Sequence, residues 1–574
     1  MKITGSKRAG NTLTLFMLVW GIVALWQASK TGLLNDEAYY RMYALYPDTG
    51  YFDHPPMAGW LMHPWLHLLS GSLGVRFNFV LTGLLSLIAL FSLIKPSGKT
   101  QVKRLILLLV SMPFVHAASF FAAPDTPLVL FSVLFFLLLK RYLFEDNLKN
   151  ALLLTLPITG MLYAKYHGIL LIFFTLIAFP DFFKRKTFYL TVAGSLLLFL
   201  PHILWQYQHD FVTLGYHLRG RVKTWSPLFI ADYLGGQLLI LGGLATIPML
   251  IAASLPKRKD PFIRILRFNL WGTLLFFLVA SFRMHIEANW TLCLITPIAY
   301  LSYHGLENRP KLWKTVKILA IPTLILLTTL RVLMVYEVSK DFPKSDELYG
   351  WEEWAAQIEQ HAGDKPVVFM NSYQRAAKFS FLTHRFAHTF NSVRYRRNQY
   401  DLWDHEERLQ GQEVFFMPNN DIFSLPYIQK ATIDSFKTRW NDYAYYTTIP
   451  DFKTMNKIRI AVHNRKTTYE PNEQATLQLT FTNPYPYPTT ITQQGEKPIW
   501  VVATMFDHTM KQGKESYLST ETFTLSPQEQ HTLSISLTMP PKEGTYYYAI
   551  GLAVDWLPPA YNSRFYKINV KECH

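Results

Sequence analysis

The chain has 574 residues, of which 50% are hydrophobic, and its formal net charge is +16. Its length suggests three to four domains, and the clustering of its apolar residues before residue 337 excludes a uniformly soluble protein. The positive charge does not indicate nucleic-acid binding, because the sequence has no zinc-finger spacing and no basic stripe interleaved with stacking aromatics.

Long apolar runs predict a polytopic α-helical membrane domain over residues 1–336. Basic residues precede the first run, Leu13 to Trp26, as in a signal peptide, but no small-residue cleavage site follows. We therefore expect an uncleaved first helix. Several runs are shorter than the roughly 20 residues that a full crossing needs. The eleven expected spans are 12–29, 75–94, 105–121, 127–139, 150–164, 168–180, 187–204, 232–255, 268–282, 290–303 and 313–335.

The charge distribution between these spans predicts their orientation. With a cytoplasmic N-terminus, the inner loops hold 22 lysine and arginine residues. The outer loops hold seven, namely Lys30, Arg41, Lys165, Arg219, Arg221, Lys223 and Arg283. Positive residues accumulate on the cytoplasmic side of membrane proteins. We expect a bacterial inner-membrane protein whose N-terminus is cytoplasmic and whose C-terminal part is periplasmic.

The other unusual polar residues fall on the outer side as well. They occur in five outer loops and include Asp36, Glu37, Asp53, His54, Asp125, Lys165, His167, His209, His217, Arg221 and Arg283. The first outer loop, about 30–74, contains two short amphipathic stretches, 38–46 and 57–69, which we expect to lie in the membrane interface. We interpret the histidines between 202 and 217 as interfacial decoration.

The C-terminal part has two different patterns. Residues 337–454 mix an amphipathic helix, 351–361, with short apolar strands at 366–370 and 413–417, and they predict a small α/β module. Residues 455–574 alternate in polarity and are punctuated by Pro, Gly and Asn, which predicts an immunoglobulin-like β-sandwich. The expected strands are 457–462, 475–481, 499–505, 531–539 and 546–554. A spacer or docking role is the default for this sandwich.

Three carboxylates are candidate catalytic residues. Asp36 and Glu37 follow the first span, where a carboxylate can take a proton from an acceptor hydroxyl. The alternative is helix capping, because Asn35-Asp36-Glu37 also suits a helix N-terminus. Asp125 lies between Pro124 and Pro127, which equally fits a tight turn. Their common side of the membrane favours a functional interpretation.

The run Tyr51-Phe52-Asp53-His54-Pro55-Pro56 is a candidate sugar or metal site. Oxygen and imidazole ligands suit several divalent metals, and His217 or His209 are candidates for a third ligand. The alternative is a rigid turn set by the two prolines. The prediction is a divalent metal held by Asp53 and His217.

Lys165, Arg221 and Arg283 lie on the outer side, against the prevailing charge bias. Each alone is explained by a side chain that reaches from a helix end to the interface. Together with the acids they favour a lipid phosphate held near the membrane surface. His54 joins this predicted donor-binding set.

These motifs together resemble the polyprenyl-phosphate-sugar transferases of the GT-C fold. The group includes the dolichyl-phosphate-mannose protein mannosyltransferases and the bacterial aminoarabinose transferases that act on lipid A. The resemblance covers about residues 10–450. It rests on Asp36-Glu37, the run from Tyr51 to Pro56, Pro124-Asp125-Thr126-Pro127, Lys165-Tyr166-His167-Gly168 and Ala288-Asn289-Trp290.

The resemblance implies roles for four residues. It makes Asp36 the residue that activates the acceptor and Asp53 part of a metal or substrate site. It places Asp125 in the same cavity and assigns Lys165 to the donor phosphate. The aminoarabinose transferases have Glu-Lys before the two prolines, whereas this chain has Asp53-His54. The C-terminal β-domain is also an addition to the basic pattern.

The sequence thus predicts an inverting glycosyltransferase that uses a polyprenyl (undecaprenyl) phosphate sugar and no nucleotide. The expected acceptor is a lipid or glycolipid such as lipid A, with a lipid-linked glycan or a protein hydroxyl as the alternatives. A secondary transporter is the rival class, although transporter sites lie near the membrane midplane. A docking protein with the β-sandwich as its working part is the third interpretation.

Overall fold

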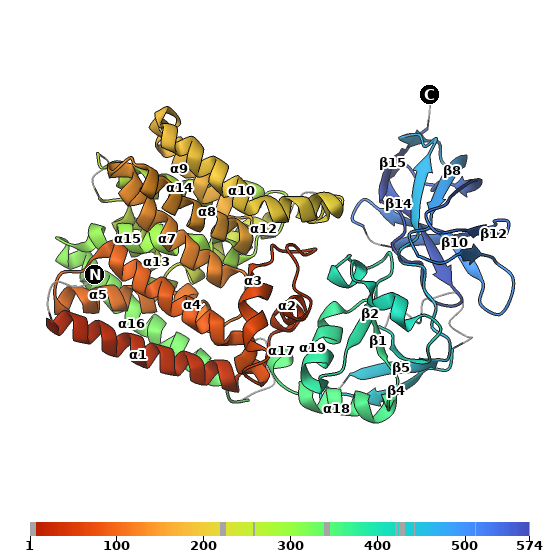
Figure 1. The fold of residues 1–574 in the computed structure, drawn as a ribbon, viewed down its shortest axis with the longest axis horizontal. Coiled ribbons are helices and arrows are strands. Elements are labelled where there is room, and N and C mark those ends of the chain that lie inside the picture. Colours follow the sequence, from red (N-terminus) through yellow and green to blue (C-terminus); the bar gives the residue numbers. More distant parts are fainter. Residues whose placement is uncertain are drawn as a thin grey trace. The chain divides into compact units, whose positions relative to one another are not determined.

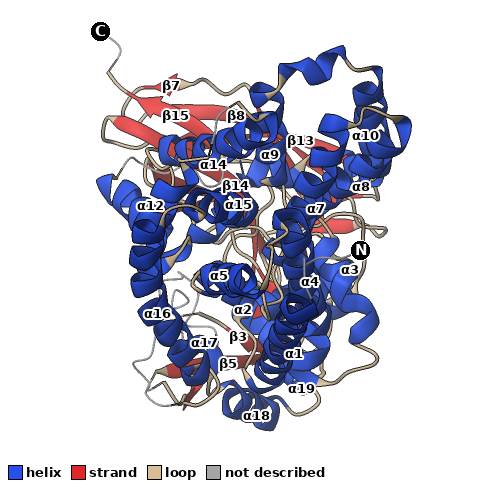
Figure 2. Cartoon of the chain, turned by 90° about the vertical axis from the view of Figure 1, so that its left-hand side faces the viewer, coloured by secondary structure: helices blue, strands red, loops and turns tan. Residues whose placement is uncertain are grey.

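The computed structural model describes residues 7–217, 226–256, 259–337, 345–419, 423, 431–440, 442–510 and 512–572. The chain divides into two compact units, Met1–Tyr349 and Gly350–His574 (Figure 1). The first unit is built from helices and loops, and the strands of the described chain all lie in the second (Figure 2).

The helices of the first unit follow the apolar runs of the sequence. They are α1 Lys7–Lys30, α2 Asn35–Leu45, α3 Met57–Met62, η1 His63–Trp65, α4 Gly71–Ile94, α5 Lys99–Val110, α6 Pro113–Ala117, α7 Asp125–Phe144, α8 Leu148–Ala164, α9 Gly168–Ala178, η2 Pro180–Lys184, α10 Lys186–Gln208, α11 Val212–Gly215, α12 Pro227–Ile240, η4 Gly243–Ala245, α13 Thr246–Ala253, α14 Pro261–Ala280, η5 Ala288–Leu294, α15 Ile295–Leu306, α16 Pro310–Leu333 and α17 Ser345–Leu348.

Six described helices, α1, α4, α7, α10, α14 and α16, are long and apolar enough to cross a membrane. The pair formed by α12 and residues 243–253 is bent by 105° and adds a seventh if it is one broken span. The remaining expected spans fall on helices of 11 to 17 residues, α5, α8, α9 and α15. The chain is therefore a multi-pass membrane protein, and the count of eleven crossings is not confirmed.

Lipid exposure explains why apolar residues cover the outside of this unit. On α1, Leu15, Leu18 and Ile22 are 64%, 59% and 66% exposed, and their spacing places them on one helical face. A helix face without polar groups suits hydrocarbon, because the helix satisfies its own backbone hydrogen bonds. Inside the unit, α4 packs against α1 and α7, and α7 packs against α8.

Close approach of two segments depends on Gly83 in α4. A Cβ atom at this position would lie 2.6 Å from the carbonyl oxygen of Ala118. Only glycine allows α4 to come this near to the segment after α6, because a methyl group needs about 3.4 Å. This contact fixes the loop that leads from α6 to the start of α7.

The second unit begins with the predicted α/β module. Its helices are α18 Trp351–Ala362 and α19 Tyr373–Thr383, and short helical turns η6 Gln399–Asp401 and η7 Asp404–Leu409 follow. Its strands are β1 Val367–Met370, β2 Ala387–Phe390, β3 Val414–Met417, β4 Asp434–Lys437 and β5 Tyr443–Ile449. The sheet order is β2-β1-β3-β5-β4, with parallel pairing among β2, β1 and β3 and antiparallel pairing in the rest.

The predicted β-sandwich occupies the rest of this unit. Its strands are β6 Arg459–His463, β7 Thr468–Tyr469, β8 Gln474–Thr482, β9 Thr489–Ile491, β10 Ile499–Asp507, β11 Gln512–Leu518, β12 Phe523–Leu525, β13 Gln530–Thr538, β14 Gly544–Val554 and β15 Tyr566–Val570. The sheets are β11-β10-β14-β15-β7, β13-β8-β6 and β12-β9. Alternate residues point into one core, as the polarity pattern predicted; in β8 these include Leu477 and Leu479.

The α/β module and the sandwich share a hydrophobic cluster. Trp556, which follows β14 of the sandwich, packs edge-on against Phe416 of β3 with 5.7 Å between ring centroids. Leu557 and Ala560 belong to the same cluster as Val368 of β1. The two parts predicted as separate domains, 337–454 and 455–574, thus form one compact unit from residue 350 onward.

Candidate active site

Three residues from distant segments of the first unit meet at one point. Nζ of Lys165 lies 2.8 Å from Oδ1 of Asp125, and Nδ2 of Asn289 donates to Oδ2 of Asp125 at 3.0 Å. Asp125 and Lys165 are only 6% and 4% exposed, and Asn289 is half-buried. A carboxylate and an ammonium group are thus held together beneath the surface, as convergence of the motifs required.

The ends of two helices explain why the Asp125 and Lys165 side chains lie close together. Asp125 is the first residue of α7, where the partial positive charge of a helix N-terminus favours a carboxylate. Lys165 directly follows α8, where the partial negative charge of a helix C-terminus favours a cation. Among the described residues, Asp125 is the sole hydrogen-bond partner of the Lys165 ammonium. An ammonium group has three donors, so two remain for a ligand oxygen.

Glu37 is engaged in a different way from Asp36. Its carboxylate is 2% exposed and forms an ion pair with Arg76, with 2.5 Å between Oε2 and Nη2. Oε1 also accepts from the backbone N–H of Ala122 at 2.8 Å. Glu37 therefore ties the first turn of α2 to the loop three residues before Asp125, which makes it a positioning residue in this structure. Asp36 in the same turn is exposed.

Arg76 completes this attachment from α4. It is fully buried, and it donates to the carbonyl oxygens of Thr31 at 2.7 Å and Gly32 at 2.8 Å. These carbonyls follow the C-terminus of α1, where backbone acceptors lack partners within the helix. Arg76 thereby connects α1, α2, α4 and the loop before α7, and this set of contacts fixes the site of Asp36.

The tyrosine-rich start of the first outer loop surrounds Asp53. The rings of Tyr43 and Tyr51 stack with 4.0 Å between centroids, and the Tyr43 hydroxyl donates to Oδ2 of Asp53 at 3.4 Å. Burial, together with the neighbouring Tyr39 and Asp53, raises the pKa of Tyr43 well above its ordinary value. Tyr43 therefore remains a hydrogen-bond donor at neutral pH. The predicted turn 51–56 is a packed, buried element.

The predicted metal ligands Asp53 and His217 are in contact, but through the backbone of Asp53 and not through its carboxylate. His217 uses Nε2 to contact the backbone carbonyl oxygen of Asp53 at 3.0 Å, and the His54 ring meets the ring of Tyr40 edge-on. In the described part of the chain, no group of three or more His, Cys, Asp and Glu has a metal-binding arrangement. The divalent metal at Asp53 and His217 stays a prediction.

The predicted cations are placed differently. Lys165 joins Asp125, whereas Arg283 follows α14 as an exposed residue. Arg221 lies outside the described residues. Of the three predicted cations, Lys165 is thus the one that the described structure brings to the Asp125 carboxylate.

The histidine-rich segment is structural, and the interpretation as interfacial decoration was wrong for His202. This side chain is buried, and its two ring nitrogens contact the Thr49 carbonyl oxygen and the Tyr166 hydroxyl, each at 2.7 Å. Trp205 donates to Oδ2 of Asp48 at 2.8 Å. A Cβ atom on Gly50 would lie 2.4 Å from the Trp205 ring, so glycine is required for this contact. Together these contacts fix the first outer loop on α10.

Sequence reasoning missed Arg76 and gave Asn289 no role of its own. An arginine within an apolar run is costly unless it has a partner or a function, and this signal identifies Arg76 at position two of the span 75–94. The partner of Asn289 was not visible in the sequence, because 164 residues separate it from Asp125.

Comparison with known proteins agrees with this architecture. The family model for dolichyl-phosphate-mannose-protein mannosyltransferase matches residues 53–205. The lipid A galacturonosyltransferase RgtD of Rhizobium johnstonii is 24% identical over 261 residues, which are 43% of this chain and 54% of that protein. The chain therefore spans about half the length of this curated relative.

Solved structures of ArnT from Cupriavidus metallidurans share the fold. The apo form has a TM-score of 0.58 at 12% identity, and the form bound to undecaprenyl phosphate has a TM-score of 0.56 at 13% identity. Both matches cover 76% of this chain and 98% of ArnT. The resemblance predicted from the motifs is thus confirmed, and this chain has the GT-C fold of the polyprenyl-phosphate-sugar transferases in the ArnT group.

Proposed function

We propose that the protein is a membrane glycosyltransferase that moves a sugar from a polyprenyl phosphate to a lipid or glycolipid acceptor. The observation that carries this proposal is the buried Asp125–Lys165 pair, joined by Asn289 and positioned near the N-terminus of α2. The charge bias supports a site on the side opposite the cytoplasm, and we assign this side to the periplasmic face of a bacterial inner membrane.

The donor class follows from the fold and from the chemistry of Lys165. ArnT binds undecaprenyl phosphate, and this chain shares its fold. A lysine with two donors left for a ligand suits a phosphate oxygen. We assign the donor phosphate to Lys165, with Arg221, Arg283 and His54 as further candidates around it.

The proposed reaction is one displacement at the anomeric carbon. A bond forms from the acceptor oxygen to this carbon while the bond from the carbon to the phosphate oxygen breaks. The electron pair leaves with the polyprenyl phosphate, whose growing charge Lys165 stabilises. Asp36 accepts the proton of an acceptor hydroxyl. Attack from the face opposite the phosphate inverts the configuration of the sugar.

Asp125 has a supporting role in this scheme. Both of its oxygens accept hydrogen bonds, from Lys165 and from Asn289. It is thus better suited to hold the lysine in place than to take a proton. The exposed Asp36 is the acid that an acceptor can reach.

The acceptor is assigned to the lipid A class, because the curated relative RgtD acts on lipid A. A protein hydroxyl is the second candidate, because the matching family model is that of protein mannosyltransferases. Supplying the protein with lipid A or with a peptide distinguishes these two candidates, because both reactions would use the same polyprenyl phosphate donor.

The test is sugar transfer by the purified protein in nanodiscs. A panel of radiolabelled undecaprenyl-phosphate sugars is supplied with lipid A, with a membrane extract or with a serine-rich peptide. We expect label on lipid A and a loss of about 10²-fold to 10⁴-fold in rate for Asp36→Asn. The exposed Lys149 on the opposite end of α8 provides the control Lys149→Gln, which should retain full transfer.

Three results would contradict parts of the proposal. Unchanged transfer by Asp36→Asn would remove this residue from the mechanism. Uptake of the labelled compound into sealed proteoliposomes, without any product across the whole panel, would favour a transporter. Label on the peptide alone would replace the lipid acceptor by a protein acceptor.

A further inference from the structure

A second arginine is buried near the same end of the helices, and the proposed transfer reaction does not use it. Arg331 belongs to the last turn of α16 and is 8% exposed. Its guanidinium lies between the rings of Trp20 and Phe120, with 5.2 Å from Cζ to each centroid. Such contacts stabilise a cation, but by only about 1–2 kcal/mol each.

The hydrogen bonds of Arg331 leave donors unused. Nε donates to Oε1 of Gln27, and the backbone carbonyl oxygen of Arg331 accepts from Nε2 of Gln27 at 3.3 Å. Nη2 is buried and has no hydrogen-bond partner. Within the described chain no carboxylate lies in ion-pairing distance of Arg331. A buried cation without a counter-ion is costly, which points to a ligand that is not part of the chain.

The surrounding charges add to this imbalance. Arg76 lies over the same Phe120 ring, with 5.8 Å from Cζ to the centroid. Glu37 forms its ion pair with Arg76, so it compensates one of the two guanidinium groups that flank Phe120. The cluster of Arg76, Arg331 and Glu37 therefore carries one excess positive charge and attracts an anion.

The depth of Arg331 in the membrane fits a lipid headgroup. Arg331 lies two residues before the end of α16, and Gln27 lies three residues before the end of α1. These offsets correspond to about 3–5 Å along a helix axis. A helix of 24 residues is about 36 Å long and exceeds the hydrocarbon core of about 30 Å. The excess of about 6 Å, shared between the two ends, places the last turn at the edge of the hydrocarbon core.

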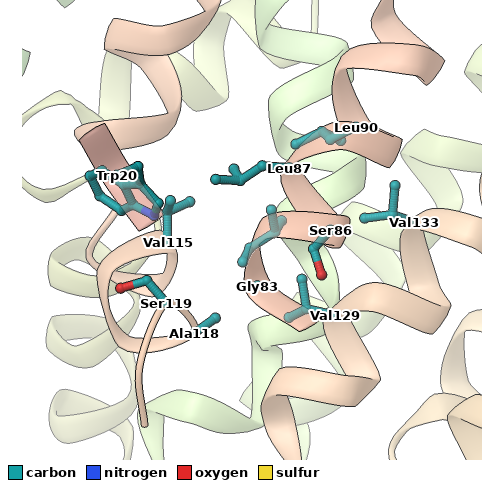
Figure 3. A pocket seen from close by; sticks show the side chains of 11 residues that line it. Trp20, Gly83, Ser86, Leu87, Leu90, Val115, Ala118, Ser119, Val129 and Val133 are labelled. Carbon is teal, nitrogen blue, oxygen red and sulfur yellow. The ribbon is translucent and has the colours of Figure 1, made fainter. Parts of the chain in front are cut away.

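A small apolar cavity lies on Trp20 as well. Its volume is about 20 Å³, and it is lined by residues of α1, α4, α7, α15 and the segment 115–119. Figure 3 shows Trp20 on one side of this cavity and Leu87, Val129 and Val133 on the other. The cavity holds no charged side chain, so the anion site is formed by Arg331 and not by the cavity.

We propose that Arg331, supported by Gln27 and Trp20, binds the phosphate group of an anionic membrane lipid. A phosphate that reaches the guanidinium accepts a charge-assisted hydrogen bond from it, and because Nη2 is buried this requires the surrounding side chains to move. The apolar outer face of α1, with Leu18 and Ile22 exposed, suits the acyl chains of the same lipid. The proposed lipid site does not require that the protein transfers a sugar.

Native mass spectrometry of the purified full chain tests the site directly. The protein in detergent is titrated with dioleoyl-phosphatidylglycerol and, separately, with dioleoyl-phosphatidylcholine. We expect the wild type to bind one phosphatidylglycerol at least about ten-fold more tightly than Arg331→Gln does, because a hydrogen bond to a charged group is lost. Arg331→Lys should bind phosphatidylglycerol with intermediate affinity, because lysine keeps the positive charge but lacks the planar guanidinium group.

Lys30→Gln is the matched control, because Lys30 is an exposed cation at the same end of α1. It should bind phosphatidylglycerol as the wild type does. Equal binding by the wild type and Arg331→Gln would overturn the proposal, as would equal binding of the two lipids. Displacement of the lipid by millimolar inorganic phosphate would assign the site to free phosphate instead.

A second measurement covers the case in which Arg331→Gln does not fold. Wild-type protein is irradiated with a phosphatidylglycerol that carries a diazirine on its headgroup, and the labelled peptides are sequenced. We expect label near Gln27 and Arg331. Label that avoids the ends of α1 and α16 would refute the site without any variant.

Discussion

Arg76 and Glu37 lie 39 residues apart in the sequence, and their side chains form a buried ion pair with two hydrogen bonds. This pair connects α4 with the first turn of α2, and through Ala122 it reaches the loop before α7. The position of Asp36 relative to Asp125 therefore depends on a contact made by neither of them. The ion pair therefore explains how α2, a helix of 11 residues, holds the exposed Asp36 in place.

The ion pair makes a first prediction about stability. Arg76→Met leaves the Glu37 carboxylate buried and unpaired, which should lower the free energy of unfolding by about 3–5 kcal/mol. Arg76→Met combined with Glu37→Gln removes both charges and should be less destabilising than the sum of the single changes. Thermal melting of the four proteins in detergent measures this coupling. Strict additivity would show that the two side chains do not interact.

The Asp125–Lys165 pair makes a second prediction about transfer. Lys165→Gln should reduce the rate by about 10²-fold, because one preorganised cation no longer stabilises the leaving phosphate. Lys165→Arg should recover part of this loss, whereas Asp125→Asn should reduce activity because the lysine loses its anchor. Transfer rates over a range of donor concentrations separate weaker binding from slower chemistry. A normal rate for Lys165→Gln would exclude this residue from the donor site.

The shared core of the second unit gives a third prediction. Trp556→Ala leaves a cavity against Phe416 and should cost about 3–5 kcal/mol. Hydrogen exchange should accelerate in β3 of the α/β module, although the altered residue belongs to the C-terminal part. Trp500→Ala is the control, because Trp500 packs on Tyr517 within the sandwich itself. Unchanged exchange in β3 for Trp556→Ala would mean that the two parts are independent.

Two buried histidines of the second unit predict a pH dependence. Burial lowers the pKa of His388 to about 3, and burial together with Arg408 lowers the pKa of His405 to about 4. Both are neutral in the folded state and take up a proton in the unfolded state below about pH 6.5. Stability is therefore fully present above pH 6.5 and declines as the pH falls toward 4.

Lowering the pH from 7 to 5 should cost about 2 kcal/mol through His388 alone. Hydrogen exchange of β1 and β2 in the full chain, at both pH values, measures the change after correction for intrinsic rates. Over the same pH range, His388→Gln should lose about 2 kcal/mol less stability than the wild type does. The comparison between the two proteins is needed because burial raises the pKa of Glu406, which has the opposite effect on stability. Equal losses in both proteins would contradict the assignment to His388.

Local patterns were sufficient to predict the elements. The apolar runs became helices because a span buried in lipid needs about 20 apolar residues and internal hydrogen bonds. The alternating run 475–481 became β8, in which buried and more exposed residues alternate because a strand presents successive side chains to opposite faces. The short strands 366–370 and 413–417 were also found, as β1 and β3. The motifs predicted which fold the membrane unit has.

The sequence by itself therefore determined the division into a helical membrane part and a strand-containing C-terminal part, together with the main helices and strands. The tertiary structure decided which polar residues touch: Lys165 with Asp125, Glu37 with Arg76 instead of a substrate, and His217 with a backbone carbonyl. The physical reason is that periodicity and composition are properties of neighbouring residues. An ion pair between segments 39 or 40 residues apart depends on helix packing, which no local pattern encodes.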